Sequence, residues 1–156
     1  MRVLSLIIFA VMTVPALAFG WGHYENTRFG YAIDIPPNFE GGRQSGNEDG
    51  QMFRWMARAQ LLTVWGGNAP GGFEQETAAM LAKASADGWN ISYQATTPTW
   101  AHFKAQRGER MLHQRMIALC DGQYAAFLFD FAMQEVANVE PVIERLERSL
   151  RGERSC

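Results

Sequence analysis

The chain has few of the residues and motifs that mark common enzyme classes. It contains only two cysteines, and neither Cys-x-x-Cys nor His-x-x-His spacing occurs, which argues against a zinc site. No serine stands in a Gly-x-Ser-x-Gly motif, and no Gly-Lys-Ser/Thr sequence is present. Neither a hydrolase nucleophile elbow nor a phosphate-binding loop is therefore indicated. The sequence predicts no cofactor and no metal site.

A long apolar run occurs only at the start of the chain. Residues 3–14 are mostly apolar, follow Arg2, and are too few to span a bilayer. The Ala-Leu-Ala sequence at 16–18 matches a secretory cleavage site. We therefore expect a signal peptide over 1–18 and a single domain over 19–156, with an uncleaved anchor as the alternative. No cysteine follows the cleavage site for lipid attachment, so a periplasmic or secreted protein without stable membrane insertion is predicted.

Neither sign of charge dominates. The chain has 14 basic and 16 acidic residues and a formal net charge of −2. This balance argues against nucleic acid and against an anionic membrane surface as partners. Aromatic residues make up 12% of the chain, and most of them are expected to fill the core of one domain.

The two cysteines, Cys120 and Cys156, form an even pair in an exported chain. Such a pair favours a disulfide that ties the end of a central strand to the C-terminus. In the chain-entropy description, a closed loop of roughly 35 residues stabilises the fold by about 3–4 kcal/mol. Two free thiols are the alternative.

The predicted elements follow the order of an α+β protein. Tyr31, Ile33 and Ile35 alternate with smaller or polar residues, which indicates a strand that Pro36-Pro37 ends. Further strands are expected over 51–55, 59–66 and 89–97, and an exposed loop over 40–50. Helices are expected over 73–87 and 139–150. The second helix has Asn138 as its expected N-cap and a Glu144–Arg148 pair one turn apart. In the strand over 89–97, Trp89, Ile91, Tyr93 and Ala95 are expected on one side. An antiparallel central sheet with helices packed against it accounts for this order.

The region 100–131 permits a prediction of strand register. Gly108-Glu109 and Asp121-Gly122 are each interpreted as two-residue hairpin turns. Counting outward pairs Lys104 with His113 and His102 with Arg115 across the first turn, and Arg115 with Leu128 and His113 with Asp130 across the second. One sheet face then carries a core wall of Phe103, Leu112, Met116, Phe127, Phe129 and Phe131.

The opposite face then carries His102, Lys104, His113, Arg115 and Asp130. One interpretation is an anion-binding surface, on which Arg115 and Lys104 donate hydrogen bonds and Asp130 orients His113. The alternative is an ordinary solvated sheet face with a cross-strand His–Asp pair. A His–Asp pair also resembles part of a hydrolytic triad, although the sequence offers no nucleophile for it.

Tryptophans provide a second candidate. Trp65, Trp89 and Trp100 lie near predicted strand ends, where indole rings can line a pocket for an apolar ligand. Filling the core is the alternative role.

The opening of the chain resembles a known fold family. The sequences NTRFGYAIDIPPNF, EDGQMF and AQLLTVWGG are similar to the N-terminal half of small secreted bacterial proteins of unknown function, and to the broader PsbP-like fold, which includes LpqN-type lipoproteins and the PsbP subunit of photosystem II. The resemblance implies an antiparallel sheet with packed helices and no catalytic residues to carry over. It also implies a binding or assembly role. The chain lacks a lipid-anchor cysteine, and nothing in it marks a photosynthetic partner.

Together these observations predict a non-enzymatic binding or assembly module. Its expected partner is an envelope protein or a small anionic or apolar ligand. A small hydrolase that uses His113 and Asp130 is the rival hypothesis, and a purely structural envelope protein is a third.

Overall fold

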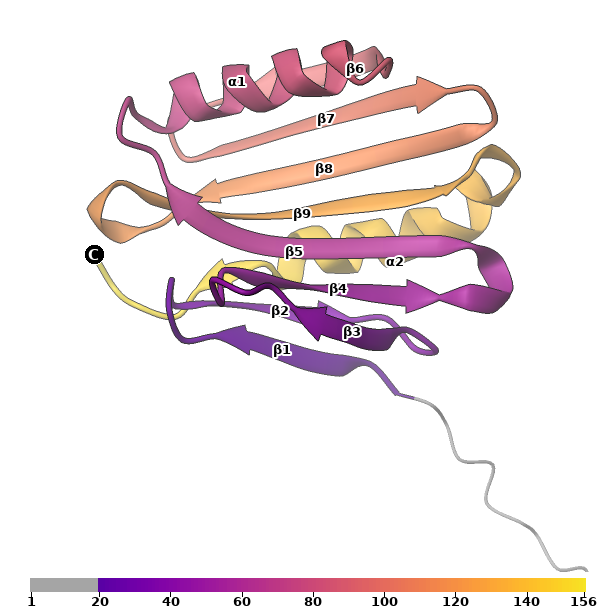
Figure 1. Cartoon of the computed structure of the whole chain (residues 1–156), viewed down its shortest axis with the longest axis horizontal. Helices are drawn as coiled ribbons and strands as arrows, with labels where there is room; N and C mark the ends of the chain where they lie inside the picture. Colours follow the sequence, from indigo (N-terminus) through magenta and orange to yellow (C-terminus); the bar gives the residue numbers. More distant parts are fainter. Residues whose placement is uncertain (1–19) are drawn as a thin grey trace, which may run out of the picture.

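The computed structural model describes residues 20–156 (Figure 1). The predicted signal peptide, 1–18, lies outside the described residues. The strands are β1 (Gly22–Asn26), β2 (Tyr31–Ile35), β3 (Glu40–Gln44), β4 (Gly50–Trp55), β5 (Gln60–Asn68), β6 (Asn90–Thr96), β7 (Trp100–Arg107), β8 (Arg110–Ala118), β9 (Gln123–Ala132) and β10 (Arg151–Gly152). The helices are α1 (Phe73–Ala86) and α2 (Val136–Ser149), with short 3-10 turns at Met56–Arg58, Cys120–Gly122 and Met133–Glu135.

Two antiparallel sheets form the framework. The larger sheet has the order β3-β4-β5-β9-β8-β7-β6, and the smaller has the order β1-β2-β10. The predicted antiparallel α+β architecture is confirmed. Both edge strands of the larger sheet contain irregular register, in β3 between Gly41 and Gln44 and in β6 between Ile91 and Tyr93. Such bulges discourage further strands from adding to a sheet edge.

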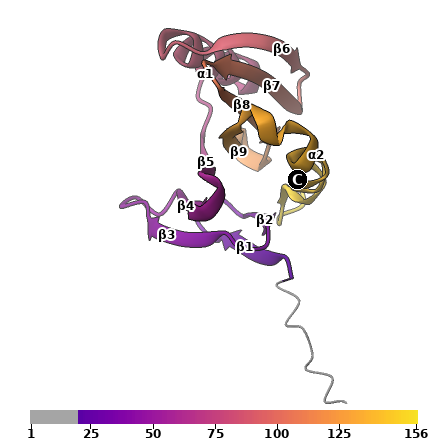
Figure 2. The ribbon, with the colours of Figure 1, turned by 90° about the vertical axis from the view of Figure 1, so that its right-hand side faces the viewer.

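The two faces of the large sheet are covered at opposite ends. Helix α1 packs on the β6–β7–β8 end, whereas α2 and the small sheet cover the other face over β9 and β5 (Figures 1 and 2). The two helices therefore lie on opposite faces of the large sheet (Figure 2).

The main core lies under α2. Phe127 and Phe129 of β9 are fully buried and belong to the same cluster as Ile33 of β2 and Leu146 of α2. Burial of each such side chain stabilises a fold by about 1.5–3 kcal/mol. The predicted strand over 31–35 is confirmed, and Tyr31, Ile33 and Ile35 point into this core. The opening stretch of the chain is therefore a core strand.

Three local predictions are wrong. The first part of the expected loop over 40–50 is strand β3. Glycines are poor strand formers, but the backbone of this segment pairs with β4 and so forms a strand. Helix α2 begins at Val136, so Asn138 lies inside the helix. The chain enters it through the preceding 3-10 turn without a side-chain cap. The Glu144–Arg148 pair is confirmed at 3.6 Å.

The third wrong prediction concerns β6. A bulge at Ser92 pairs Ile91 with Ala105 and Tyr93 with Lys104. Consecutive odd residues of β6 therefore point to opposite faces. Ile91 packs beneath α1, whereas Tyr93 lies on the other face and is 49% exposed.

The register of the β8–β9 hairpin differs from the prediction by one residue. The turn has three residues, Cys120–Gly122, because Asp121 and Gly122 both adopt positive φ and Leu119 N–H bonds to the Gln123 carbonyl. His113 therefore pairs with Phe129, and Arg115 with Phe127.

A one-residue shift moves every side chain of a strand to the other face. The expected single core wall is therefore divided between the two faces. Phe103, Leu112 and Met116 face α1, whereas Phe127, Phe129 and Phe131 face α2.

The disulfide between Cys120 and Cys156 is confirmed. It holds the C-terminal segment against the start of the chain, where Glu153 N–H bonds to the Gly30 carbonyl and Arg154 donates to the Phe29 carbonyl.

Candidate functional site

Four of the predicted basic-face residues do lie together. His102 and Lys104 of β7 pair with Arg115 and His113 of β8, as the first turn predicted. Because alternate residues share a face, all four side chains project to the α2 side of the sheet. The sequence thus located this group correctly.

Asp130 does not belong to this group. It pairs with Leu112 on the α1 side, and its carboxylate binds Arg110, with Nη2 at 2.6 Å and Nε at 2.8 Å. The predicted His113–Asp130 pair is wrong, because it depended on the two-residue form of the second turn. The hydrolase hypothesis required this pair, so His113 and Asp130 cannot act together as it proposed.

The carboxylate that binds His113 comes from α2. Glu147 Oε1 lies 2.9 Å from His113 Nε2, and the His113 ring is 2% exposed and stacks on Phe127. The hydrogen bond from His113 lowers the pKa of the Glu147 carboxyl. His113 Nδ1 is buried without a hydrogen-bond partner among the described residues. A solvent water cannot reach that nitrogen, so this His–Glu pair does not form an accessible catalytic base.

His102 lies between the buried pair and the surface. Its ring centroid is 5.3 Å from that of His113, and its Nδ1 is 3.7 Å from Glu147 Oε1. Burial lowers the pKa of His102, and the neighbouring His113 lowers it further. Its Nε2 is buried without a hydrogen-bond partner among the described residues, so His102 contributes mainly a ring surface.

Arg115 is the unusual residue of this group. Its guanidinium lies 4.4 Å from the centroid of the Trp100 ring, and its Nε is buried without a hydrogen-bond partner. Within residues 20–156 its side chain forms no hydrogen bond and no ion pair within 4.0 Å. Burial lowers the pKa of Arg115, although the guanidinium stays charged at every physiological pH.

Aromatic rings also stack along the neighbouring strands beside Arg115. His102 has the Trp100 ring centroid at 6.2 Å on one side and the Tyr93 centroid at 4.8 Å on the other. Exposed Lys104 adds a second positive charge. We call the surface formed by Tyr93, Trp100, His102, Lys104 and Arg115 the basic platform. Tyr93 could not be placed on it from the sequence, because the bulge at Ser92 decides which face it takes.

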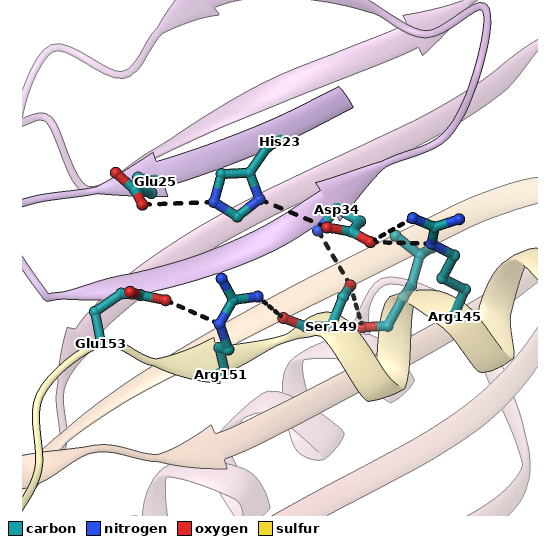
Figure 3. Close-up of polar contacts among 8 residues, drawn as sticks. His23, Glu25, Asp34, Arg145, Ser149, Arg151 and Glu153 are labelled. Atoms are coloured by element: carbon teal, nitrogen blue, oxygen red, sulfur yellow. Dashed lines mark hydrogen bonds and ion pairs between the residues drawn. The ribbon is translucent and has the colours of Figure 1, made fainter. Parts of the chain in front are cut away.

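A second polar cluster offers a contrast (Figure 3). Asp34 of β2 accepts hydrogen bonds from Arg145 at 2.9 Å, and the Asp34 backbone N–H donates to Ser149 Oγ at 3.1 Å. His23 lies 3.5 Å from the carboxylates of both Asp34 and Glu25. Here the charged groups neutralise one another, which indicates that the cluster anchors α2 to β2.

The three tryptophans of the predicted ligand pocket do not lie together. Trp65 and Trp89 line one cavity of about 520 Å³ between α1 and the sheet. Trp100 lies on the opposite face, in the basic platform. The predicted group therefore contributes to two separate surfaces.

Neither a metal cluster nor a membrane helix is found in the part of the chain that the structure describes. No group of three or more His, Cys, Asp or Glu side chains there is arranged to hold a metal ion. No helix there is long and apolar enough to cross a bilayer.

Comparison with known proteins identifies the fold. No protein-family model and no curated protein sequence matches the chain. Among solved structures, the chain is similar to the cyanobacterial PsbP protein CyanoP from Synechocystis sp. PCC 6803, with a TM-score of 0.65 and 14% sequence identity over 94% of this chain and 98% of that one. At this identity the likeness concerns the fold alone. The chain has a PsbP-like fold, as its opening residues led us to expect.

Proposed function

We propose that this protein is an exported, non-catalytic binding module that docks an acidic segment of an envelope partner on the basic platform. Export rests on the secretory pattern of residues 1–18. The observation that carries the docking proposal is Arg115, a half-buried cation without an ion-pair partner among the described residues.

Glu147 is the nearby counter-charge of Arg115, but it forms no ion pair with the guanidinium within 4.0 Å. A half-buried cation without a direct ion pair is costly to desolvate, and an incoming carboxylate in contact with it offsets that cost. The Arg115 guanidinium is already held against Trp100, so little conformational freedom is lost when it binds. Glu147 is engaged with buried His113 and is not available as a close partner.

The composition of the platform also fits a protein partner. Trp, Tyr and Arg are the residues most enriched among interface hot spots. On this platform, Trp100, half-exposed Tyr93 and Arg115 lie on neighbouring strands, with Lys104 beside them. The rings offer apolar contact area, and the two cations favour a partner segment that carries carboxylates.

A peptide titration tests this proposal. The probe is a short synthetic peptide that alternates glutamate and tyrosine, observed through the indole N–H signals of the tryptophans by NMR. We expect the Trp100 signal to shift most and binding to weaken as salt rises. Arg115→Gln should lower the affinity at least tenfold, or about 1.4 kcal/mol.

The matched control is Arg54→Gln. Arg54 is an exposed arginine on β4 whose side chain forms one hydrogen bond among the described residues, to the Met52 sulfur. Its loss should leave the affinity unchanged. Equal binding by the Arg115→Gln variant, or a response centred on another tryptophan, would refute docking on the platform.

A further inference from the structure

The cavity beneath α1 has the size and lining of a small-molecule site. Its volume of about 520 Å³ lies within the range of roughly 300–1,000 Å³ that ligand pockets occupy. The two indoles of Trp65 and Trp89 contribute to its wall, together with the apolar side chains of Met80, Leu112 and Leu128.

The cavity follows from how α1 meets the sheet. Only two residues of α1 are buried, Thr77 and Ala84, and both are small. They approach β8 and β7 at separate points, in two distinct clusters with Met116 and Phe103. Thr63 and Trp65 of β5 and Leu128 of β9 form the sheet side of the space beside α1.

The polar part of the cavity wall carries no unpaired positive charge. Thr63 and Gln114 are uncharged, and the carboxylate of Glu76 disfavours an anionic ligand. Gln114 is 4% exposed, and its amide nitrogen donates to the Met80 sulfur at 3.1 Å, a weak acceptor. A ligand oxygen would be a better acceptor for that amide. The only basic residue in the wall, Lys83, is paired with Asp87 at 2.7 Å.

From these observations we infer that the cavity between α1 and the sheet binds an uncharged, flat, mainly apolar molecule that bears a hydrogen-bonding oxygen or nitrogen. Its rings pack against Trp65 and Trp89, and its polar atom meets Gln114. The cavity is on the opposite side of the sheet from the basic platform, so this site does not depend on the proposed docking function.

A pair of matched dyes tests both the place and the charge preference. N-phenyl-1-naphthylamine is flat and uncharged, and 1-anilinonaphthalene-8-sulfonate has the same rings with one negative charge. We expect the uncharged dye to bind one site per chain, and the sulfonate to bind there at least tenfold more weakly. Energy transfer from tryptophan and the shift of indole N–H signals report the place of binding.

Tryptophan variants give the control. Trp65→Ala and Trp89→Ala should each lower the affinity for the uncharged dye about tenfold, whereas Trp100→Ala should leave it unchanged. Ala79→Trp keeps both indoles and fills the cavity from α1, and it should abolish binding even if an alanine variant fails to fold. Tighter binding of the sulfonate, loss of binding in Trp100→Ala, or unchanged binding in Ala79→Trp would overturn the inference.

Discussion

Glu147 offers a sharp test of how the buried histidine is held. Glu147→Ala removes the acceptor 2.9 Å from His113 Nε2. His113 is 2% exposed, and its Nδ1 already lacks a partner, so both ring nitrogens would then be buried without hydrogen bonds. An unsatisfied buried polar group costs about 1–3 kcal/mol. We expect the free energy of unfolding in urea to fall by about 2 kcal/mol.

Two further variants separate this effect from loss of charge. Glu147→Gln keeps an acceptor oxygen and should retain most of the stability. Glu144→Ala removes only an exposed pair with Arg148, at 3.6 Å, and should cost less than about 0.5 kcal/mol. Equal free energies of unfolding for the two alanine variants would refute the argument.

The same cluster makes stability depend on pH. The pKa of His102 is lowered, mainly by burial, so the unfolded chain binds a proton more readily than the folded one. Its contribution is complete above the ordinary histidine pKa of about 6.5 and is lost as pH falls below it. The pKa of Glu147 is also lowered, so its contribution is lost as pH falls below about 4.5. Wild-type stability should therefore fall in two stages on acidification, and Glu147→Ala should flatten the second.

Two other changes test the framework. The double variant Cys120→Ser/Cys156→Ser should lower the free energy of unfolding by about 3–4 kcal/mol, because the bridge closes a loop with a sequence separation of 36. Unfolding curves that stay the same with and without reductant would contradict this. Gly66→Ala should cost about 1–3 kcal/mol, because its new Cβ would lie 2.8 Å from Phe29 Cβ. Gly46→Ala, which meets nothing within 4 Å, is the control, and equal melting temperatures would contradict the close packing of β5 on the small sheet.

The sequence predicted the structure correctly where one local feature, a hairpin turn or a pair of cysteines, decided it. The Gly108-Glu109 turn is a two-residue loop, so counting from it placed His102 opposite Arg115. An even cysteine count predicted the disulfide between residues 120 and 156.

Prediction failed where backbone geometry departed from the simplest form. Asp121 and Gly122 both adopt positive φ in a three-residue turn, and the extra residue moved Asp130 to the other face of the sheet. The bulge at Ser92 did the same for Tyr93. Glu147 reaches His113 across 34 positions of sequence, and only the packing of α2 on the sheet brings them together. These three corrections define the basic platform and its neighbouring buried pair.

The most direct test of the docking proposal is photo-crosslinking from the platform in the envelope of the native host. Benzoylphenylalanine replaces Tyr93 on the platform or, as a control, Met133, an exposed residue in the turn before α2. The proposal predicts one discrete adduct from position 93, and the crosslinked peptide of the partner should be acidic. This adduct should disappear in the Arg115→Gln variant. No adduct should form from position 133. An adduct from position 93 that survives Arg115→Gln, or no adduct from it at all, would contradict docking on the basic platform.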